Sequence, residues 1–268
     1  MTHFKDKVVV ITGGSDGIGR ALVNIFLQSG AKVSTCGRNA DKLYQLQTLH
    51  AGKSFFASQK DVSSEKECET FIAETINVFG TIDILINNAG ISMRALFTET
   101  NLQTLKNVMD INFWGTVYCT KFALPYILQN CGTVAGISSI AGYRGLPGRT
   151  GYSASKFAVI GFFEALRTEL LESGANVMWI CPGFTASNIR NAALTKDTTP
   201  QGASPMDEGL MMTAEECAQL ILHGIEKRKR TMVLTFNDKR TVFMNRFFAQ
   251  LADKLTRKFF YKNGKLVK

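Results

Sequence analysis

The chain has 268 residues, of which 45% are hydrophobic, so its length and composition allow one large α/β domain with a buried core. No run of about 18 apolar residues occurs, and the charged N-terminal residues lead directly into a strand pattern. We therefore expect a cytoplasmic protein with neither a membrane-spanning helix nor a secretory signal. Six cysteines lie scattered without a C-x-x-C pair, and no cluster has ligand spacing, so we expect neither disulfides nor a metal site.

The net charge of +9 is concentrated at the end of the chain. Residues 227–268 contain 13 Lys and Arg against two Asp, which leaves 18 basic and 20 acidic residues before them. This contrast predicts two parts: a nearly neutral domain over residues 1–227 and a basic extension over residues 228–268.

Short β-branched runs alternate with segments of helical apolar spacing along the first part of the chain. The expected strands are Val8–Ile11, Lys32–Cys36, Ile82–Ile86, Thr133–Ile137 and Asn176–Cys181, and the expected helices are 17–29, 40–50, 65–79, 101–128, 154–172 and 214–227. Such alternation predicts a single Rossmann-type, doubly wound parallel sheet with helices on both faces. Ligands bind beyond the carboxyl ends of such strands, and the motifs described below fall there.

A glycine-rich turn joins the first strand to the first helix. Its sequence, Thr12 to Gly19, lets backbone amides approach a pyrophosphate at a helix N-terminus. The residues expected to bind the cofactor there are Gly13, Ser15, Asp16, Gly17, Ile18 and Gly19. The second strand is followed by Arg38 and Lys42 instead of an acid, so a positive, hydroxyl-lined pocket predicts NADPH as the cofactor.

Tyr152 and Lys156 are four residues apart, and on a helix two positions with this spacing share one face. An ammonium beside a phenol lowers the phenol pKa, which would make Tyr152 a usable proton donor and acceptor. Hydride transfer to a ketone leaves negative charge on oxygen and needs such a donor, together with a second one that we assign to Ser139. Ser138 is expected to be only a neighbour at the end of the strand.

These motifs, in this order, resemble the short-chain dehydrogenase/reductase family over about residues 5–225, including the spacing G-x-x-x-G-x-G of the turn. The resemblance implies that Lys156 also binds the nicotinamide ribose and that Asn112 holds a water linking the lysine to solvent. It implies further cofactor contacts from Asp61, Val62, Asn88, Ala89, Gly90, Tyr152, Lys156, Pro182, Gly183 and Thr185. Relatives are commonly dimers or tetramers, so we expect a homodimer or homotetramer.

The irregular stretch Ala186–Met212, which contains Met206, Leu210, Met211 and Met212, is long enough to form a lid over the nicotinamide. Ile91–Phe97, Tyr143–Leu146 and Phe184 would supply other, largely apolar walls. Such a pocket favours a hydrophobic ketone, although the same side chains could equally pack the core.

Two segments resemble 3-ketosphinganine reductases in amino-acid sequence. They are Cys36–Leu43 and Gly145–Arg167, the second of which contains the tyrosine motif. The resemblance implies NADPH-dependent reduction of a long-chain keto lipid at membranes. The alternatives are a steroid or retinoid-type ketone, a 3-ketoacyl group on an acidic carrier and, outside enzymes, an NADP(H)-binding sensor or scaffold.

The basic extension contains an apolar series at intervals of mostly three and four residues: Met244, Phe247, Phe248, Leu251, Leu255 and Phe259. Lys254, Arg257 and Lys258 are interspersed with it. This pattern predicts a cationic amphipathic helix that lies on an anionic membrane surface. Docking on the enzyme body or on a second subunit competes with that interpretation, and nucleic acid is not an expected partner.

Overall fold

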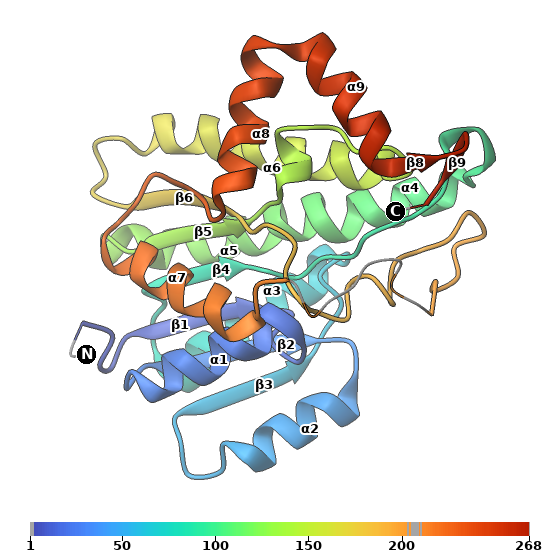
Figure 1. The fold of residues 1–268 in the computed structure, drawn as a ribbon. Helices are drawn as coiled ribbons and strands as arrows, with labels where there is room; N and C mark the ends of the chain where they lie inside the picture. Colours follow the sequence, from blue (N-terminus) through green and yellow to red (C-terminus); the bar gives the residue numbers. More distant parts are fainter. Residues whose placement is uncertain (1–2, 203, 205–208, 210, 268) are drawn as a thin grey trace.

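The computed structural model describes residues 3–202, 204, 209 and 211–267, and its centre is a parallel seven-stranded sheet of order β3-β2-β1-β4-β5-β6-β7 (Figure 1). The strands are β1 (Val8–Thr12), β2 (Lys32–Gly37), β3 (Phe55–Gln59), β4 (Ile84–Asn87), β5 (Thr133–Ile137), β6 (Asn176–Cys181) and β7 (Thr231–Val233). The order reverses between β1 and β4, which is where ligands bind in such sheets. The predicted Rossmann-type fold is thereby confirmed.

Helices cover both faces of the sheet (Figure 1). One face carries α1 (Gly17–Gln28) and α7 (Ala214–Glu226), and the other carries α3 (Glu65–Phe79), α5 (Gly115–Gln129) and α6 (Thr150–Glu169). Successive residues of a strand point to opposite faces, so Val9 packs in the α1 core while Val10 packs in the α5 core. The remaining elements of this part are α2 (Ala40–Leu49), α4 (Leu102–Met109) and two short 3₁₀ turns, Phe97–Glu99 and Ile140–Gly142.

Two strands of the seven-stranded sheet, β3 and β7, were not expected from the sequence, and they are its two edge strands. β3 is only half-buried, and its sequence lacks the continuous apolar run by which the inner strands were predicted. β7 has three residues, follows a run of basic residues, and pairs with β6 in parallel. Because β7 belongs to the sheet, the predicted division at residue 227 does not coincide with the end of the sheet.

The long helix expected over residues 101–128 is interrupted. A π-helical turn, Asp110–Trp114, separates α4 from α5. Two local features accompany the interruption. The side chain of Asn112 bonds to the backbone of Ile91, and Gly115 lies against Val62, where an added Cβ would be 2.9 Å from the carbonyl oxygen. Insertions of this kind are frequent at functional sites.

The C-terminal extension forms two helices instead of one. α8 (Phe236–Phe247) and α9 (Ala249–Phe260) meet at Phe248, whose φ of −136° and ψ of 53° break the helix. A small hairpin of β8 (Tyr261–Lys262) and β9 (Lys265–Leu266) follows. The pair of helices projects away from the sheet beyond α6 (Figure 1). Within the described residues, no helix has the length and apolarity needed to cross a membrane.

Candidate active site

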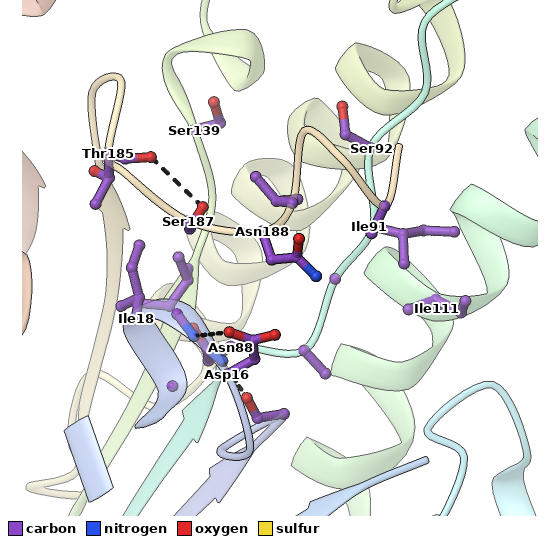
Figure 2. A pocket seen from close by; sticks show the side chains of 18 of the residues that line it. Asp16, Ile18, Asn88, Ile91, Ser92, Ile111, Ser139, Thr185, Ser187 and Asn188 are labelled. Atoms are coloured by element: carbon purple, nitrogen blue, oxygen red, sulfur yellow. Dashed lines mark hydrogen bonds between the residues drawn. The ribbon is translucent and has the colours of Figure 1, made fainter. Parts of the chain in front are cut away.

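A cleft of about 420 Å³ opens along the carboxyl ends of the central strands. It brings together every cofactor residue predicted from the sequence, together with Ser139, Tyr152 and Lys156, whereas Asn112 is not among its lining residues. Asp16 and Ile18 lie at the start of α1, and Asn188 lies between them and the Ile91–Ser92 segment (Figure 2). The motifs, far apart along the chain, therefore form one site.

The glycine turn fits a phosphate group because its backbone is packed too closely for side chains. An added Cβ at Gly13, where φ is +70°, would lie 2.9 Å from the Cα of Ala89. At Gly19 it would lie 2.2 Å from the carbonyl oxygen of Gly13. Asp16 caps α1 by accepting the Gly17 N–H at 2.8 Å, and the next amides of the first turn have no earlier carbonyl of the helix to bond. Such a helix start attracts an anion.

Thr12 and Asn88 fix this turn to the end of β4. The Thr12 hydroxyl oxygen accepts the N–H groups of Asn88 and Ala89 at 3.1 and 3.0 Å. The Asn88 amide donates to the carbonyl oxygens of Thr12 and Gly13 at 2.9 and 3.2 Å. Asn88 was predicted, but the role of Thr12 was not, since a strand-end threonine carries no motif of its own.

The far end of the cleft is lined by the two predicted cations. Lys42 bonds to the Asp16 carboxylate, while a guanidinium nitrogen of Arg38 lies 3.9 Å from a carboxylate oxygen of Asp61. Burial raises the pKa of Asp16, but the hydrogen bond from Lys42 and the cap on Gly17 outweigh burial and bring that pKa below its usual value. Arg38 remains 61% exposed, so its guanidinium is accessible to a further anion.

At the other end of the cleft, α6 places Tyr152 and Lys156 on one face, as expected. The Lys156 ammonium nitrogen lies 5.7 Å from the centre of the Tyr152 ring and donates to the carbonyl oxygen of Ile137 at 2.8 Å. The Ser139 hydroxyl hydrogen-bonds to the Tyr152 phenol. The Ser138 hydroxyl instead donates to the Lys156 carbonyl oxygen at 3.0 Å, a structural role.

The electrostatics of this pair differ from the sequence-based expectation. Burial raises the pKa of Tyr152 above its ordinary value, against the opposing effects of the Ser139 hydrogen bond and the charge of Arg149. Lys156 is 4% exposed, and burial lowers its pKa to about 8. The expected lowering of the phenol pKa by Lys156 is therefore wrong for this structure, because the ammonium is directed at Ile137 and desolvation dominates.

Asn112 acts on the backbone beside the cleft. Its amide oxygen accepts the Ile91 N–H at 2.8 Å, and its nitrogen donates to the Ile91 carbonyl oxygen and to the Ser155 hydroxyl, both at 2.9 Å. These bonds hold the segment that follows Gly90, where an added Cβ would lie 3.1 Å from the Asn112 amide oxygen. The expected water between Asn112 and Lys156 stays a prediction.

The substrate end is more polar than predicted. Arg149 lines it, is 8% exposed, and lies under the ring of Phe260 with 5.4 Å between the guanidinium carbon and the ring centre. Burial lowers the pKa of Arg149 to about 10. Two further lining residues, Lys60 and Ile111, were not indicated by the sequence. Neither belongs to a spaced motif, so no signal in one sequence could have found them.

The expected apolar walls are only partly present. Of Ile91–Phe97, only Ile91 and Ser92 line the cleft, and of Tyr143–Leu146 only Leu146 does, while Phe184 lines it as predicted. Tyr143 points elsewhere, since its hydroxyl oxygen accepts the Trp179 indole N–H at 2.8 Å.

The first part of the predicted lid borders the cleft. Residues 187–190 and Ala192 line the cleft. The segment is held by short backbone bonds: the Arg94 N–H donates to Leu194 at 2.8 Å, and the Ala186 N–H donates to Met212 at 2.8 Å. Met206 and Leu210, which the sequence placed in this lid, lie outside the described residues. Opening and closing of the segment stays a prediction.

The site combines a cradle for a dinucleotide phosphate with a hydroxyl pair beside a buried lysine, which defines a nicotinamide-dependent oxidoreductase. A sequence model described as short chain dehydrogenase matches residues 7–198. The chain belongs to this family.

Curated relatives agree with that assignment, and a solved structure shares the fold. The chain is 36% identical over 240 residues to dehydrogenase/reductase SDR family member 7B of Mus musculus, covering 87% of this chain and 74% of that protein. It is 35% identical over 233 residues to 11-beta-hydroxysteroid dehydrogenase-like 2 of Arabidopsis thaliana, covering 83% and 72%. A short chain dehydrogenase/reductase from Burkholderia phymatum, solved in complex with NAD, shares the fold with a TM-score of 0.83 at 24% identity, covering 94% of this chain and 96% of that one.

Proposed function

We propose that the protein is an NADPH-dependent reductase of a hydrophobic ketone. The observation that carries the proposal is the Tyr152 phenol, hydrogen-bonded to Ser139, at one end of a cleft whose other end holds the glycine turn and Arg38. A bound nicotinamide cofactor would supply the hydride that a carbonyl carbon accepts.

The protein groups then handle the negative charge that develops on the carbonyl oxygen. Tyr152 donates a proton to that oxygen, and the raised pKa of the phenol keeps it protonated near neutral pH, as a donor in the reducing direction requires. Ser139 donates a second hydrogen bond to the same oxygen. Lys156 binds the ribose and places a positive charge beneath the Tyr152 ring.

The cofactor preference is assigned to Arg38 and Lys42, which line the cleft together with Ser15 of the glycine turn. A 2′-phosphate gains charge-assisted hydrogen bonds from such cations. We expect Arg38→Ala to lower kcat/KM for NADPH by about tenfold or more and to leave that for NADH nearly unchanged. The exposed Arg240→Ala serves as the control. A wild-type enzyme that uses NADH as well as NADPH would refute the assignment.

The substrate is proposed as a long-chain keto lipid, with 3-ketosphinganine first because of the sequence resemblance. A steroid ketone is the second candidate, favoured by relatives named 11-beta-hydroxysteroid dehydrogenase-like. NADPH oxidation measured with 3-ketosphinganine, ketosteroids and 3-ketoacyl carriers ranks these classes by kcat/KM. Turnover of none of them would reject the proposed function.

The proposal includes a location and an assembly. We place the protein in the cytoplasm, in peripheral contact with a membrane through the C-terminal extension, as a homodimer or homotetramer. Analytical ultracentrifugation of the full chain tests the assembly, and a single species of monomer mass would refute it.

A further inference from the structure

The outer side of the two C-terminal helices carries a concentrated group of exposed apolar side chains. We call it the C-terminal apolar face, and it consists of Phe236, Phe243, Phe247, Phe248, Leu251, Leu255 and Phe259. Phe247 is 61% exposed and Leu255 is 46% exposed. Single exposed apolar residues are ordinary on protein surfaces, but a contiguous group marks an interaction site.

The helix α9 is docked with its apolar stripe outward. Leu251, Leu255 and Phe259 recur every four residues and form one stripe on the exposed side. The opposite side of α9 is turned to the body, where Asp253 and Thr256 bond to the guanidinium of Arg144 at 2.6 and 3.2 Å. The body thus holds this helix by these polar contacts and by the buried Ala252 and Phe260, and it leaves Leu251 and Leu255 exposed.

The same arrangement holds for α8. Its Asn245 accepts a hydrogen bond from Arg144 at 2.9 Å and donates one to the Tyr143 carbonyl oxygen at 2.8 Å. Its Asp238 is buried against Gly183, where an added Cβ would lie 2.4 Å from a carboxylate oxygen of Asp238. Of the two acidic side chains of these helices, Asp238 is therefore buried against the body, and the exposed Asp253 is paired with Arg144.

Cations remain around the apolar face. The two helices carry Lys239, Arg240, Arg246, Lys254, Arg257 and Lys258, and none of these six forms an ion pair with a described residue. Lys254 and Lys258 lie three residues after Leu251 and Leu255, so they border the apolar stripe. An apolar face with a basic border is suited to the headgroup region of an anionic bilayer.

The apolar face also reaches the mouth of the cleft. The ring of Phe259 stacks on that of Phe184, with 6.3 Å between ring centres, and Phe184 lines the cleft. The adjacent Phe260 packs over Arg149, which lines the substrate end. An apolar path therefore runs from the outer face of α9 to the site where Tyr152 lies.

We propose that the C-terminal apolar face binds an anionic phospholipid bilayer and that a membrane-dissolved ketone enters the cleft along Phe259 and Phe184. The entry route rests on the proposed reduction of a ketone, whereas the membrane contact does not depend on catalysis. A second copy of the chain is the less suitable occupant, because a symmetric contact through this face would bring the same cations together.

The test uses the full chain and co-sedimentation with vesicles of phosphatidylcholine, with or without phosphatidylserine. The double variant Phe247→Ser and Leu255→Ser removes apolar groups that contact neither the cleft nor Arg144. We expect the wild type to sediment with the phosphatidylserine vesicles and the double variant to bind them at least about tenfold more weakly. Leu171→Ser, at an exposed leucine after α6, is the matched control and should bind as the wild type does.

Activity measurements separate this inference from the proposed function. The double variant should reduce a small water-soluble ketone as fast as the wild type but lose kcat/KM for a ketone dissolved in anionic vesicles. Equal vesicle binding by the wild type and the double variant, or no binding by either, would overturn the inference. The inference would also be overturned if the wild type were a dimer, the double variant were a monomer, and neither bound vesicles. If no ketone is turned over but vesicle binding follows the expected order, the function fails while the membrane contact stands.

Discussion

Helices α1 and α9 are both amphipathic and both have 12 residues, yet they are docked in opposite ways. α1 buries its apolar side, including Leu22 and Phe26, against the sheet. α9 turns Asp253 and Thr256 to the body and leaves Leu255 outside. The comparison shows that apolar periodicity predicts a helix but does not say which side faces the protein. In α9, the polar contacts to Arg144 and the burial of Phe260 accompany the outward position of Leu255.

The largest effect is expected at Tyr152, near the N-terminus of α6. Tyr152→Phe removes the proton donor but keeps the ring, so turnover should fall by about a thousandfold while NADPH binding is retained. Stopped-flow or steady-state NADPH oxidation measures turnover, and fluorescence titration measures NADPH binding. Tyr44→Phe, at an exposed position on α2, is the control. Turnover near the wild-type rate in Tyr152→Phe would exclude the mechanism.

The next largest effect is expected at Gly19, in the closely packed turn at the start of α1. Such close backbone packing distinguishes the α1 region from the C-terminal extension. Gly19→Ala would place a Cβ 2.2 Å from the Gly13 carbonyl oxygen, so the phosphate cradle must shift. We expect NADPH affinity to fall by about a hundredfold or more, since the loop and the helix start move together. Isothermal titration calorimetry measures this.

Gly161→Ala is the matched control for Gly19→Ala, because an added Cβ at Gly161 meets nothing within 4 Å. Gly161 lies within α6, so alanine there should leave NADPH affinity unchanged and raise the free energy of unfolding by up to about 1 kcal/mol. If the two alanines had the same effect on affinity, the cradle would not depend on the close approach at Gly19.

The same contrast explains how much the sequence could predict. The sheet and the cofactor residues were predictable because each depends on a few adjacent residues, such as the turn around Gly13 or the four-residue spacing of Tyr152 and Lys156. β3 was not predicted because its half-buried side chains lack a clear period. The position of Arg149 in the site was not predicted because it depends on packing under Phe260, which lies more than a hundred residues later in the chain.

The site itself was predicted better than its electrostatics. The neighbours of Tyr152 along α6 follow from the spacing of residues, but a pKa depends also on burial and on groups from other elements. The hydroxyl of Ser139, the carbonyl of Ile137 and the charge of Arg149 all come from outside α6. No spacing along one helix contains that information.

Because Lys156 is buried, the free energy of unfolding should depend on pH differently in the wild type and in the variant Lys156→Met. The folded pKa of about 8 lies below the ordinary value of 10.5, so the unfolded chain binds more protons between these values. The free energy of unfolding of the cofactor-free wild type should therefore rise relative to that of Lys156→Met as pH increases from about 8 to 10.5. The relative gain is on the order of 3 kcal/mol.

Chemical denaturation of both proteins across this pH range measures that difference. Titrating groups that do not interact with Lys156, including the buried thiol of Cys36, are common to both proteins and cancel in it. The thiol of Cys181 feels the charge of Lys156, but burial raises its pKa to about 12, above this pH range. Parallel curves for wild type and Lys156→Met would contradict the lowered pKa of the ammonium.

The smallest expected effect concerns the anchor of the extension. Arg144→Met removes the guanidinium that bonds to Asn245, Asp253 and Thr256, so α8 and α9 should open locally at a free energy lower by about 2 kcal/mol. Native-state hydrogen exchange of the α9 amides measures this. Lys66→Met breaks an exposed ion pair with Glu69 and should change α9 exchange by nothing measurable. Because the guanidinium of Arg144 bonds to residues of α8 and α9 and to none of α1, only the exchange of the extension should respond to Arg144→Met. An equal acceleration in α1 would mean that the extension and the sheet unfold as one unit.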